Sequence, residues 1–161
     1  MTVTVGTRIL RISYFMKKLY KIPKVSKREI PKLRRKLTLV FNKFIRLRDK
    51  DKGCISCVTG RVENAGHFKS KGAQPKPSMA FSELNVAGQC IHCNFTLGGN
   101  PKGYEKGLVK RYGKGILEKL EIQAALKQNP WTRFEFQAMI DLYTQKLHGL
   151  RETWESSEWL K

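Results

Sequence analysis

Two Cys-x-x-Cys pairs constrain the fold of this chain more than any other feature of its sequence. Cys54 and Cys57 form the first pair and Cys90 and Cys93 the second, with residues 58–89 between them. Such a turn lets two thiolates approach one ion, and two turns complete a tetrahedral zinc site. A thioredoxin-like redox pair needs a single motif in a βαβ setting, which the surrounding sequence does not predict. We therefore expect a structural zinc ion that takes no part in catalysis, because four thiolates close its coordination shell.

The charge of the chain points to a polyanionic partner. The 161 residues include 32 Lys and Arg against 13 Asp and Glu, a formal net charge of +19, and most of the excess lies in residues 1–53. Because such charge repels itself unless a polyanion neutralises it, we expect nucleic acid as the partner. The apolar stretch from Ile9 to Met16 is too short to span a membrane and lacks the features of a signal peptide. We therefore expect a cytoplasmic location and no membrane partner.

Hydrophobic spacing predicts an amphipathic helix of about 16–18 residues that begins near Pro31. A small β-hairpin region is expected over residues 52–68, with a strand from Val62 to Phe68. Residues 69–83 have the composition of an exposed loop, and a short strand is expected over residues 85–89. The apolar face of the helix should contain Leu33, Leu37, Val40, Phe41, Phe44 and Ile45.

Three further helices are expected after the second cysteine pair. They cover residues 102–112, residues 115–127, and a stretch from the capping box Thr132–Glu135 to about Leu150. The apolar content of the last helix is Phe134, Met139, Ile140, Leu142, Tyr143 and Leu147. The chain thus divides into a basic arm (1–30), a helix with the cysteine-containing core (31–113) and a C-terminal helical region (114–161).

Three polar residues around the cysteine pairs follow one another in an order typical of a catalytic motif. His67 ends the first expected strand, Asn85 begins the next, and Asn94 directly follows Cys93. In the order Cys-x-x-Cys, Gly-His, Asn, Cys-x-x-Cys-Asn, they resemble the His-Asn-Asn form of the HNH, or ββα-metal, nuclease pattern. The last element is also similar to that of phage endonuclease VII, a four-way-junction resolvase.

Residues 41–113 resemble the lambdoid phage NinG/Rap recombination endonuclease family more closely still. The matching stretches are residues 44–49, 65–68, 85–86, 89–94, 98–100, 104–113 and 131–135. The resemblance implies an α+β fold with a zinc-stapled ββα-metal (HNH, treble-clef-like) core. An N-terminal basic helix and C-terminal helices would flank this core.

The resemblance also implies a one-metal mechanism of phosphodiester hydrolysis. His67 would act as general base, since the pKa of an imidazole lies near working pH. Asn94 would bind a catalytic Mg²⁺ or Mn²⁺ ion, and Asn85 would orient His67 or brace the loop. In many HNH enzymes an acid or a second histidine precedes the base, where this chain has Gly66. The first candidate for the second metal ligand is therefore Glu63 and the second is Asn64.

The resemblance implies an endodeoxyribonuclease that cuts branched DNA, such as Holliday junctions and D-loops, in phage-type recombination. Two opposed cuts require two active sites, which implies a homodimer. Other recombination proteins are further candidate partners, and the location would be the host cytoplasm. The expected DNA contacts are Lys69, Lys71, Lys32, Arg34, Arg35, Lys36 and Lys43.

Three other functions remain compatible with these residues. An HNH nuclease of homing, restriction or packaging type would act on linear duplex DNA. A non-catalytic zinc module would bind DNA without cutting it, which the missing acid favours and the pair His67 and Asn94 disfavours. A basic structural RNA-binding protein would need no residue of the His67 type.

Overall fold

The computed structural model describes residues 29–69 and 76–158, with side chains described as far as residue 152. The expected basic arm lies outside the described residues apart from its last two positions. Lys71 also lies outside them. The division into three segments therefore stays a prediction.

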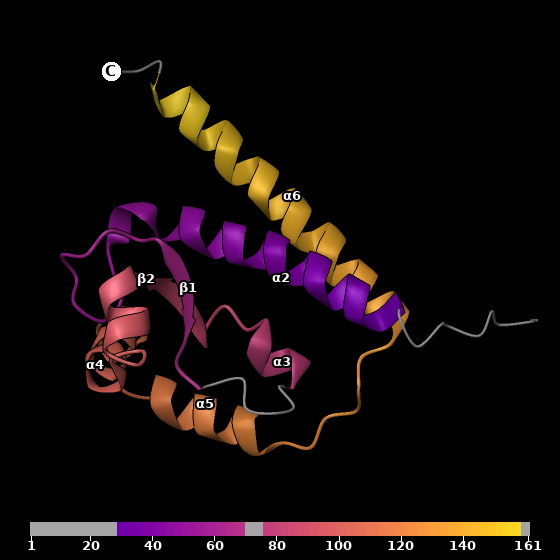
Figure 1. Cartoon of the computed structure of the whole chain (residues 1–161), viewed down its shortest axis with the longest axis horizontal. Coiled ribbons are helices and arrows are strands. Elements are labelled where there is room, and N and C mark those ends of the chain that lie inside the picture. The colour runs from indigo at the N-terminus through magenta and orange to yellow at the C-terminus, as the bar shows by residue number, and fades with distance from the viewer. Residues whose placement is uncertain (1–28, 70–75, 159–161) are drawn as a thin grey trace, which may run out of the picture.

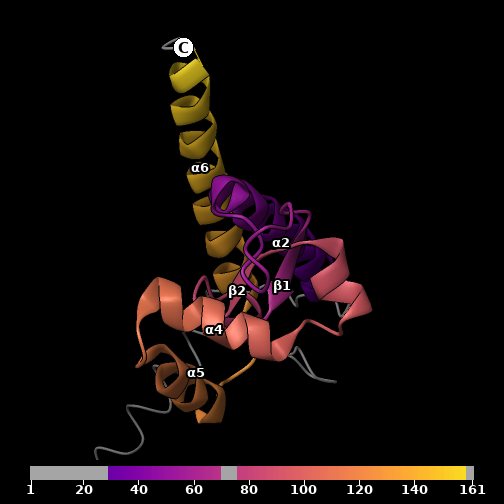
Figure 2. The same cartoon turned by 90° about the vertical axis from the view of Figure 1, so that its left-hand side faces the viewer.

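Two helical layers enclose a two-stranded sheet (Figures 1 and 2). Helices α2 (Glu29–Arg48) and α6 (Arg133–Glu158) lie side by side against one face of the sheet, and helices α4 (Pro101–Tyr112) and α5 (Ile116–Ala125) pack against the other. Short elements connect these layers: η1 (Lys50–Lys52), α3 (Pro77–Ala80) and η2 (His92–Thr96). The fold is thus mixed α+β, as expected, with a very small β component.

The sheet brings the stretches before and after the long central segment together. Strand β1 (Asn64–His67) runs antiparallel to strand β2 (Val86–Gln89), with Asn64 opposite Gln89 and His67 opposite Val86. Because side chains alternate along a strand, the two faces of the sheet serve different cores. Val86 packs with α2 and α6, whereas its neighbour Ala87 packs with α4 and α5.

Each face of the sheet has its own hydrophobic core. In the first core, the ring of Phe41 from α2 makes edge contacts with Phe81 and with Tyr143 from α6. In the second core, Tyr104 from α4 is almost fully buried and its hydroxyl donates to the carbonyl of Gly66 over 2.9 Å. Burial of apolar surface at roughly 25 cal/mol per Å² holds both layers on the sheet.

A buried carboxylate joins α2 to the sheet. The Asp49 side chain is 0% exposed and accepts a bidentate pair of hydrogen bonds from Arg48 at 3.0 and 2.8 Å. It also accepts the backbone N–H of Gly88 in β2 at 2.8 Å. The Nη1 atom of Arg111 in α4 lies 3.1 Å from an Asp49 carboxylate oxygen and forms an ion pair with it, without the geometry of a hydrogen bond. Through Nη2, Arg111 also donates to the carbonyl of Gly53 at 3.2 Å.

The helices follow the sequence-based predictions closely. Helix α2 buries Leu37, Phe41, Phe44 and Ile45, while Leu33 and Val40 are half-buried. The next two helices match the predicted ranges to within two residues, and Gly113 ends α4 with a φ of 86°. The capping box at the start of α6 is formed, since Glu135 accepts the N–H of Thr132 and donates its own N–H to the Thr132 hydroxyl.

Helix α6 continues past the predicted end and presents a different face. It extends to Glu158 and its core residues are Phe136, Ile140, Tyr143 and Leu147, whereas Phe134 is 80% exposed. The sequence-based prediction counted Phe134 in the apolar content of this helix, but in the first turn its ring faces solvent. None of the described helices is long and apolar enough to cross a lipid bilayer.

Two sequence-based predictions for the central segment are wrong. The expected hairpin within residues 52–68 does not form, because β1 pairs with β2 while the chain around the first cysteine pair turns around the thiol cluster. The expected exposed loop over residues 69–83 contains the helical turn α3, followed by Phe81, which is 5% exposed. The polar composition of this segment outweighed its few apolar residues in the prediction, although Phe81 packs in the first core and Met79 in the second.

Replacing Asp49 by Asn should destabilise the fold by about 3–5 kcal/mol, because Arg48 and Arg111 would lose the countercharge of a buried ion pair. Urea unfolding followed by circular dichroism measures this change. Asp51→Asn is the matched control, since Asp51 is exposed in η1. Equal stability of the two variants would contradict the assigned role of Asp49.

Stability should also fall in acid because of the same carboxylate. Burial alone would raise the pKa of Asp49, but the hydrogen bond and charge of Arg48, together with Gly88 N–H and Arg111, lower it to about 2. Its contribution of roughly 2 kcal/mol is therefore complete above about pH 4 and is lost as the pH falls towards 2. Unfolding free energies measured from pH 6 to pH 2 should show this loss in the wild-type chain and a smaller one in Asp49→Asn.

Candidate metal centre and the polar residues around it

The four cysteines form one compact cluster. Their Sγ atoms all lie within 4.8 Å of one another, and those of Cys57 and Cys90 are 3.9 Å apart. A Zn–S distance of about 2.3 Å in a tetrahedron requires sulfur atoms about 3.8 Å apart. Cys57 is exposed and the other three cysteines are buried. The cluster therefore fits a zinc ion held by four thiolates.

Hydrogen bonds to sulfur surround this cluster. The N–H of Cys93 donates to the Sγ of Cys90 at 3.4 Å, and the side-chain amide of Asn100 donates to the Sγ of Cys93 at 3.5 Å. Such contacts orient the ligands of a metal site. A side chain at Gly60 would lie 2.8 Å from the Sγ of Cys90, so the chain can pass the cluster there only as glycine.

The thiols differ in how readily they ionise. Although burial favours the protonated form of Cys54, the backbone N–H groups of Cys90, Cys57 and Ser56 lower its pKa to about 7. Burial raises the pKa of Cys93 to about 12, despite the hydrogen bond from Asn100. Because metal binding requires thiolates, loading of this cluster should release protons.

Gln89 connects the two cysteine pairs and closes the space next to His67. Its buried side-chain amide donates to the hydroxyl of Ser56 and to the carbonyl of Gly99, both at 2.7 Å. A Cβ atom at Gly66 would lie 1.8 Å from the Gln89 Oε1 atom. The position directly before His67 therefore has no room for the acid or histidine that many HNH enzymes carry there.

His67 lies at the end of β1, on the face turned towards α2 and α3. Its ring is half-buried, and Nε2 lies 3.0 Å from the carbonyl oxygen of Ala80. Because a carbonyl can only accept, this hydrogen bond places the proton on Nε2. Nδ1 is then the ring atom that carries a lone pair able to accept a proton.

Asn85 is fully buried and braces the loop around His67. Its side chain accepts the N–H of Lys69 at 2.8 Å and donates to the carbonyls of Lys69 and Met79 at 3.2 and 2.9 Å. The bond to Met79 holds α3, whose Ala80 carbonyl contacts His67. The structure thus gives Asn85 a bracing position, without a hydrogen bond to His67 among the described residues.

The three proposed ligands of a catalytic cation lie close to the second cysteine pair. Asn94 is half-buried in η2, and its side chain makes no hydrogen bond to another described residue. Glu63 Oε2 accepts the N–H of Ile91 at 3.0 Å, which brings this carboxylate to the turn that carries Asn94. The Nδ2 atom of Asn64 is buried without a hydrogen-bond partner among the described residues.

The structure does not join His67 to Asn94 directly. His67 contacts α3, whereas Asn94 belongs to the turn after Cys90, and no hydrogen bond links the two side chains within the described part of the chain. Asp49, which belongs to one of the family-like stretches, is committed to the buried ion pairs. These ion pairs of Asp49 were not predicted from the sequence, although the adjacent Arg48 at the end of an amphipathic helix could have indicated one of them.

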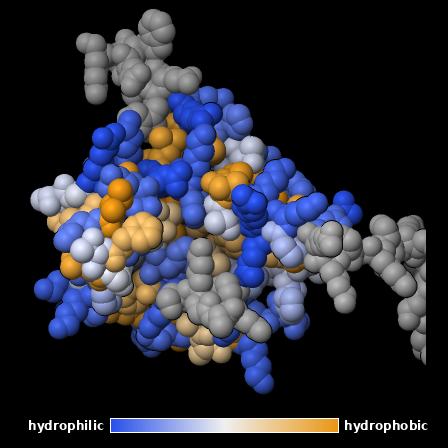
Figure 3. All heavy atoms as spheres, in the orientation of Figure 1, coloured by the Kyte–Doolittle hydropathy of each residue, from blue (hydrophilic) through white to orange (hydrophobic). Residues whose placement is uncertain are grey.

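The basic residues singled out in the sequence have different surroundings. The Lys69 ammonium forms an ion pair with Glu121 of α5 and lies 5.3 Å from the centre of the Phe68 ring. Helix α2 carries the others that are described: Lys32, Arg35, Lys36 and Lys43 are exposed, and Arg34 is half-buried. Figure 3 shows strongly hydrophilic side chains, in dark blue, gathered along the course of α2.

The fold and the cysteine cluster define a mixed α+β protein that could hold a metal such as zinc. Comparison with known proteins adds the family: a model described as Bacteriophage Lambda NinG protein matches residues 15–153. The chain belongs to this NinG family. No solved structure matches the chain.

Named relatives agree with this assignment. The chain is 38% identical over 114 residues to Protein ninG of Salmonella phage P22. The aligned residues make up 70% of this chain and 54% of that protein. It is 37% identical over 114 residues to Protein ninG of Escherichia phage lambda, and the aligned residues again make up 70% of this chain and 54% of the relative. The chain thus spans about half the length of the curated relatives it matches.

Purified protein should contain about one zinc ion per chain, because the four thiolates form a single closed site. Replacing Cys93 by Ser should abolish stoichiometric zinc binding and much of the near-ultraviolet circular dichroism, since binding of a structural zinc contributes directly to folding. Thr96→Ala, an exposed change in the neighbouring turn, is the control. Atomic absorption and thermal unfolding measure both effects, and a zinc-free wild-type protein of unchanged stability would contradict the assignment.

Proposed function

We propose that this NinG-family chain is an HNH-type endodeoxyribonuclease that cuts branched DNA in phage recombination. The observation that carries the proposal is the position of His67 at the end of a two-stranded antiparallel sheet. There the Ala80 carbonyl orients its ring and leaves Nδ1 as the basic atom. The cluster of four cysteines that could hold zinc supports the ββα-metal form of the core.

In this proposal His67 removes a proton from water. The water oxygen attacks the phosphorus in line with the leaving oxygen, the bond from phosphorus to that oxygen breaks, and Nδ1 accepts the proton of the water while Nε2 stays hydrogen-bonded to Ala80. Asn85 acts as a positioning residue, because it ties α3 and Lys69 to the start of β2. The hydrogen bond to Ala80 keeps the ring in one tautomer, as general base catalysis requires.

A divalent cation, Mg²⁺ or Mn²⁺, would stabilise the charge that develops on the phosphate. The residues that fit it are Asn94, whose amide is uncommitted among the described residues, and Glu63, which uses only Oε2 to accept a hydrogen bond. Mg²⁺ is commonly held by one or two carboxylates together with phosphate oxygens and water. This donor set therefore fits the ion without a carboxylate at position 66, with Asn64 as a further candidate.

The charge of the chain supports DNA as the substrate. A net charge of +19 and an exposed basic face of α2 favour contacts to backbone phosphates, which are independent of sequence. Recognition through backbone and shape suits branched DNA. Two opposed cuts in one junction would need two copies of the chain, so a homodimer is part of the proposal.

A zinc module that binds DNA without cutting it is the second candidate. It is favoured by the closed space at Gly66, where Gln89 leaves no room for a carboxylate next to His67. An HNH nuclease for linear duplex DNA would use the same residues as the first candidate and differ only in substrate.

Replacing His67 by Ala should lower the cleavage rate of a four-way junction in Mg²⁺ by 10²-fold or more, a typical effect of removing a general base. His148→Ala is the matched control, because His148 is an exposed histidine of α6. The wild type should cut the junction in Mg²⁺, should not cut it in EDTA, and should leave a linear duplex of the same sequence intact.

Other results would select another function. Cleavage of both DNA substrates would identify a nuclease for linear duplex DNA. Tight binding without cleavage in Mg²⁺ or Mn²⁺ would identify the zinc module. Equal rates for His67→Ala and the wild type would contradict the role of His67 as base.

A further inference from the structure

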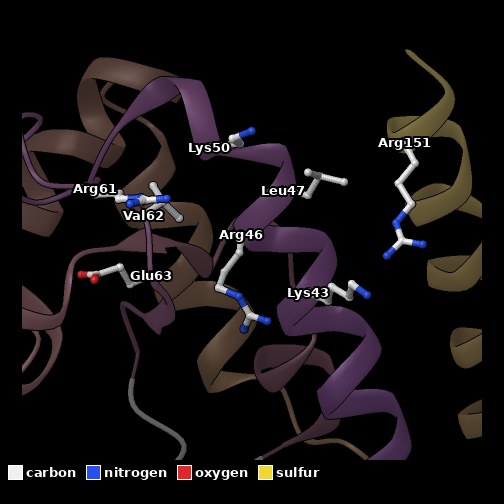
Figure 4. A pocket seen from close by; sticks show the side chains of 8 residues that line it. All are labelled: Lys43, Arg46, Leu47, Lys50, Arg61, Val62, Glu63 and Arg151. Atoms are coloured by element: carbon white, nitrogen blue, oxygen red, sulfur yellow. The ribbon is translucent and has the colours of Figure 1, made fainter. Parts of the chain in front are cut away.

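A strongly basic pocket lies between α2, the segment before β1, and α6 (Figure 4). Its volume is about 410 Å³. The positively charged lining residues are Lys43, Arg46, Lys50, Arg61 and Arg151. The single acid in the lining, Glu63, uses its carboxylate to accept the N–H of Ile91 at 3.0 Å, at the second cysteine pair.

Most of these cations form no ion pair with another described residue. Lys43, Arg46, Arg61 and Arg151 form neither an ion pair nor a side-chain hydrogen bond with any residue in the described ranges 29–69 and 76–158. Several other basic side chains are paired within the fold, as Arg48 and Arg111 are with Asp49 and as Lys146 is with Glu83. The pocket therefore concentrates positive charge that the fold itself does not neutralise.

The geometry of this charge suits a phosphate group. Lys43 and Arg46 are three residues apart, so they project from one side of α2, and Lys50 lines the same pocket from η1, just after the end of that helix. Arg61 and Arg151 come from two other parts of the chain, which Figure 4 shows around the same space. Convergent like charges repel one another, and an anion with several oxygen atoms relieves that repulsion while arginines bind it with directed hydrogen bonds.

We propose that this pocket holds a backbone phosphate of a nucleic acid strand. Glu63 and His67 are four residues apart along an extended chain, which places the pocket about 13 Å from the proposed base. At about 3.4 Å per nucleotide along a duplex, this distance corresponds to about four base pairs. The identity of the polyanion rests on the proposed function, but binding at the pocket does not require that His67 act as a base.

The test is DNA binding by the full chain carrying Arg46→Gln and Arg61→Gln together. Fluorescence anisotropy without added divalent cation measures the affinity for a labelled junction from 50 to 400 mM NaCl. Loss of one neutralised phosphate should reduce the slope of log K against log salt by about 0.9 and weaken binding about tenfold at 100 mM. Lys106→Gln with Lys119→Gln is the control, because it removes the same charge from exposed positions of α4 and α5.

Thermal unfolding separates a binding role from a structural one. If the two arginines bind phosphate, the double variant should be at least as stable as the wild type, because repulsion falls. Inorganic phosphate should then raise the melting temperature of the wild type more than chloride at equal ionic strength does, and should lose this effect in the variant. A marked loss of stability in the variant would overturn the proposal.

The remaining outcomes distinguish the sources of phosphate and the two proposals. Retained DNA affinity with a lost effect of inorganic phosphate would mark a site for free phosphate and overturn the nucleic acid assignment. Equal weakening in the control variant would overturn the pocket as a specific subsite. Pocket-dependent DNA binding in a wild type that cuts no DNA would support the pocket while the proposed nuclease function failed.

Discussion

The buried carboxylate of Asp49 is the interaction on which the rest of the structure depends. A carboxylate taken out of water is costly unless its lone pairs are satisfied, and here Arg48, Arg111 and the Gly88 N–H satisfy them. These partners belong to α2, α4 and β2, so one charge fixes the two helical layers relative to the sheet. The Arg111 bond to Gly53 carries the same constraint to the residue before the first cysteine.

The cysteine cluster and Gln89 then determine what the site next to them can hold. The two cysteine pairs meet in one cluster, β2 runs directly into the second pair, and Gln89 fills the interior between the two turns. Its side chain takes the space that a residue larger than glycine at position 66 would need. Any cation ligand for chemistry at His67 must therefore come from outside that position, which is why Glu63 and Asn94 are the donors that the proposal uses.

The sequence was sufficient for the features governed by local rules and by short motifs. Helical periodicity predicted the core face of α2, and capping rules predicted the start of α6 and the end of α4. The two Cys-x-x-Cys pairs predicted that the four thiols lie together. Features that depend on distant partners were missed. The pairing of β1 with β2 follows from closure of the cluster, and burial of Phe81 follows from two cores that exist only in the folded chain. The basic pocket likewise needs α6 beside α2, since Arg151 lies far from Arg46 in sequence.

The positions of the basic side chains indicate from which side of the molecule DNA would approach in the proposed function. Lys69 is close to His67 in sequence, yet its ammonium is paired with Glu121, on the side of the sheet that carries α5. Lys43, Arg46, Arg61 and Arg151 form no ion pair with a described residue and line one pocket beside α2 and α6, and α2 lies on the face of the sheet to which His67 points. Exposed lysines such as Lys106 and Lys119 are spread over α4 and α5, whereas the pocket cations surround one space, so we expect a strand to approach from the α2 side. On that path, the strand would meet the pocket and the basic atom of His67 on one face of the molecule.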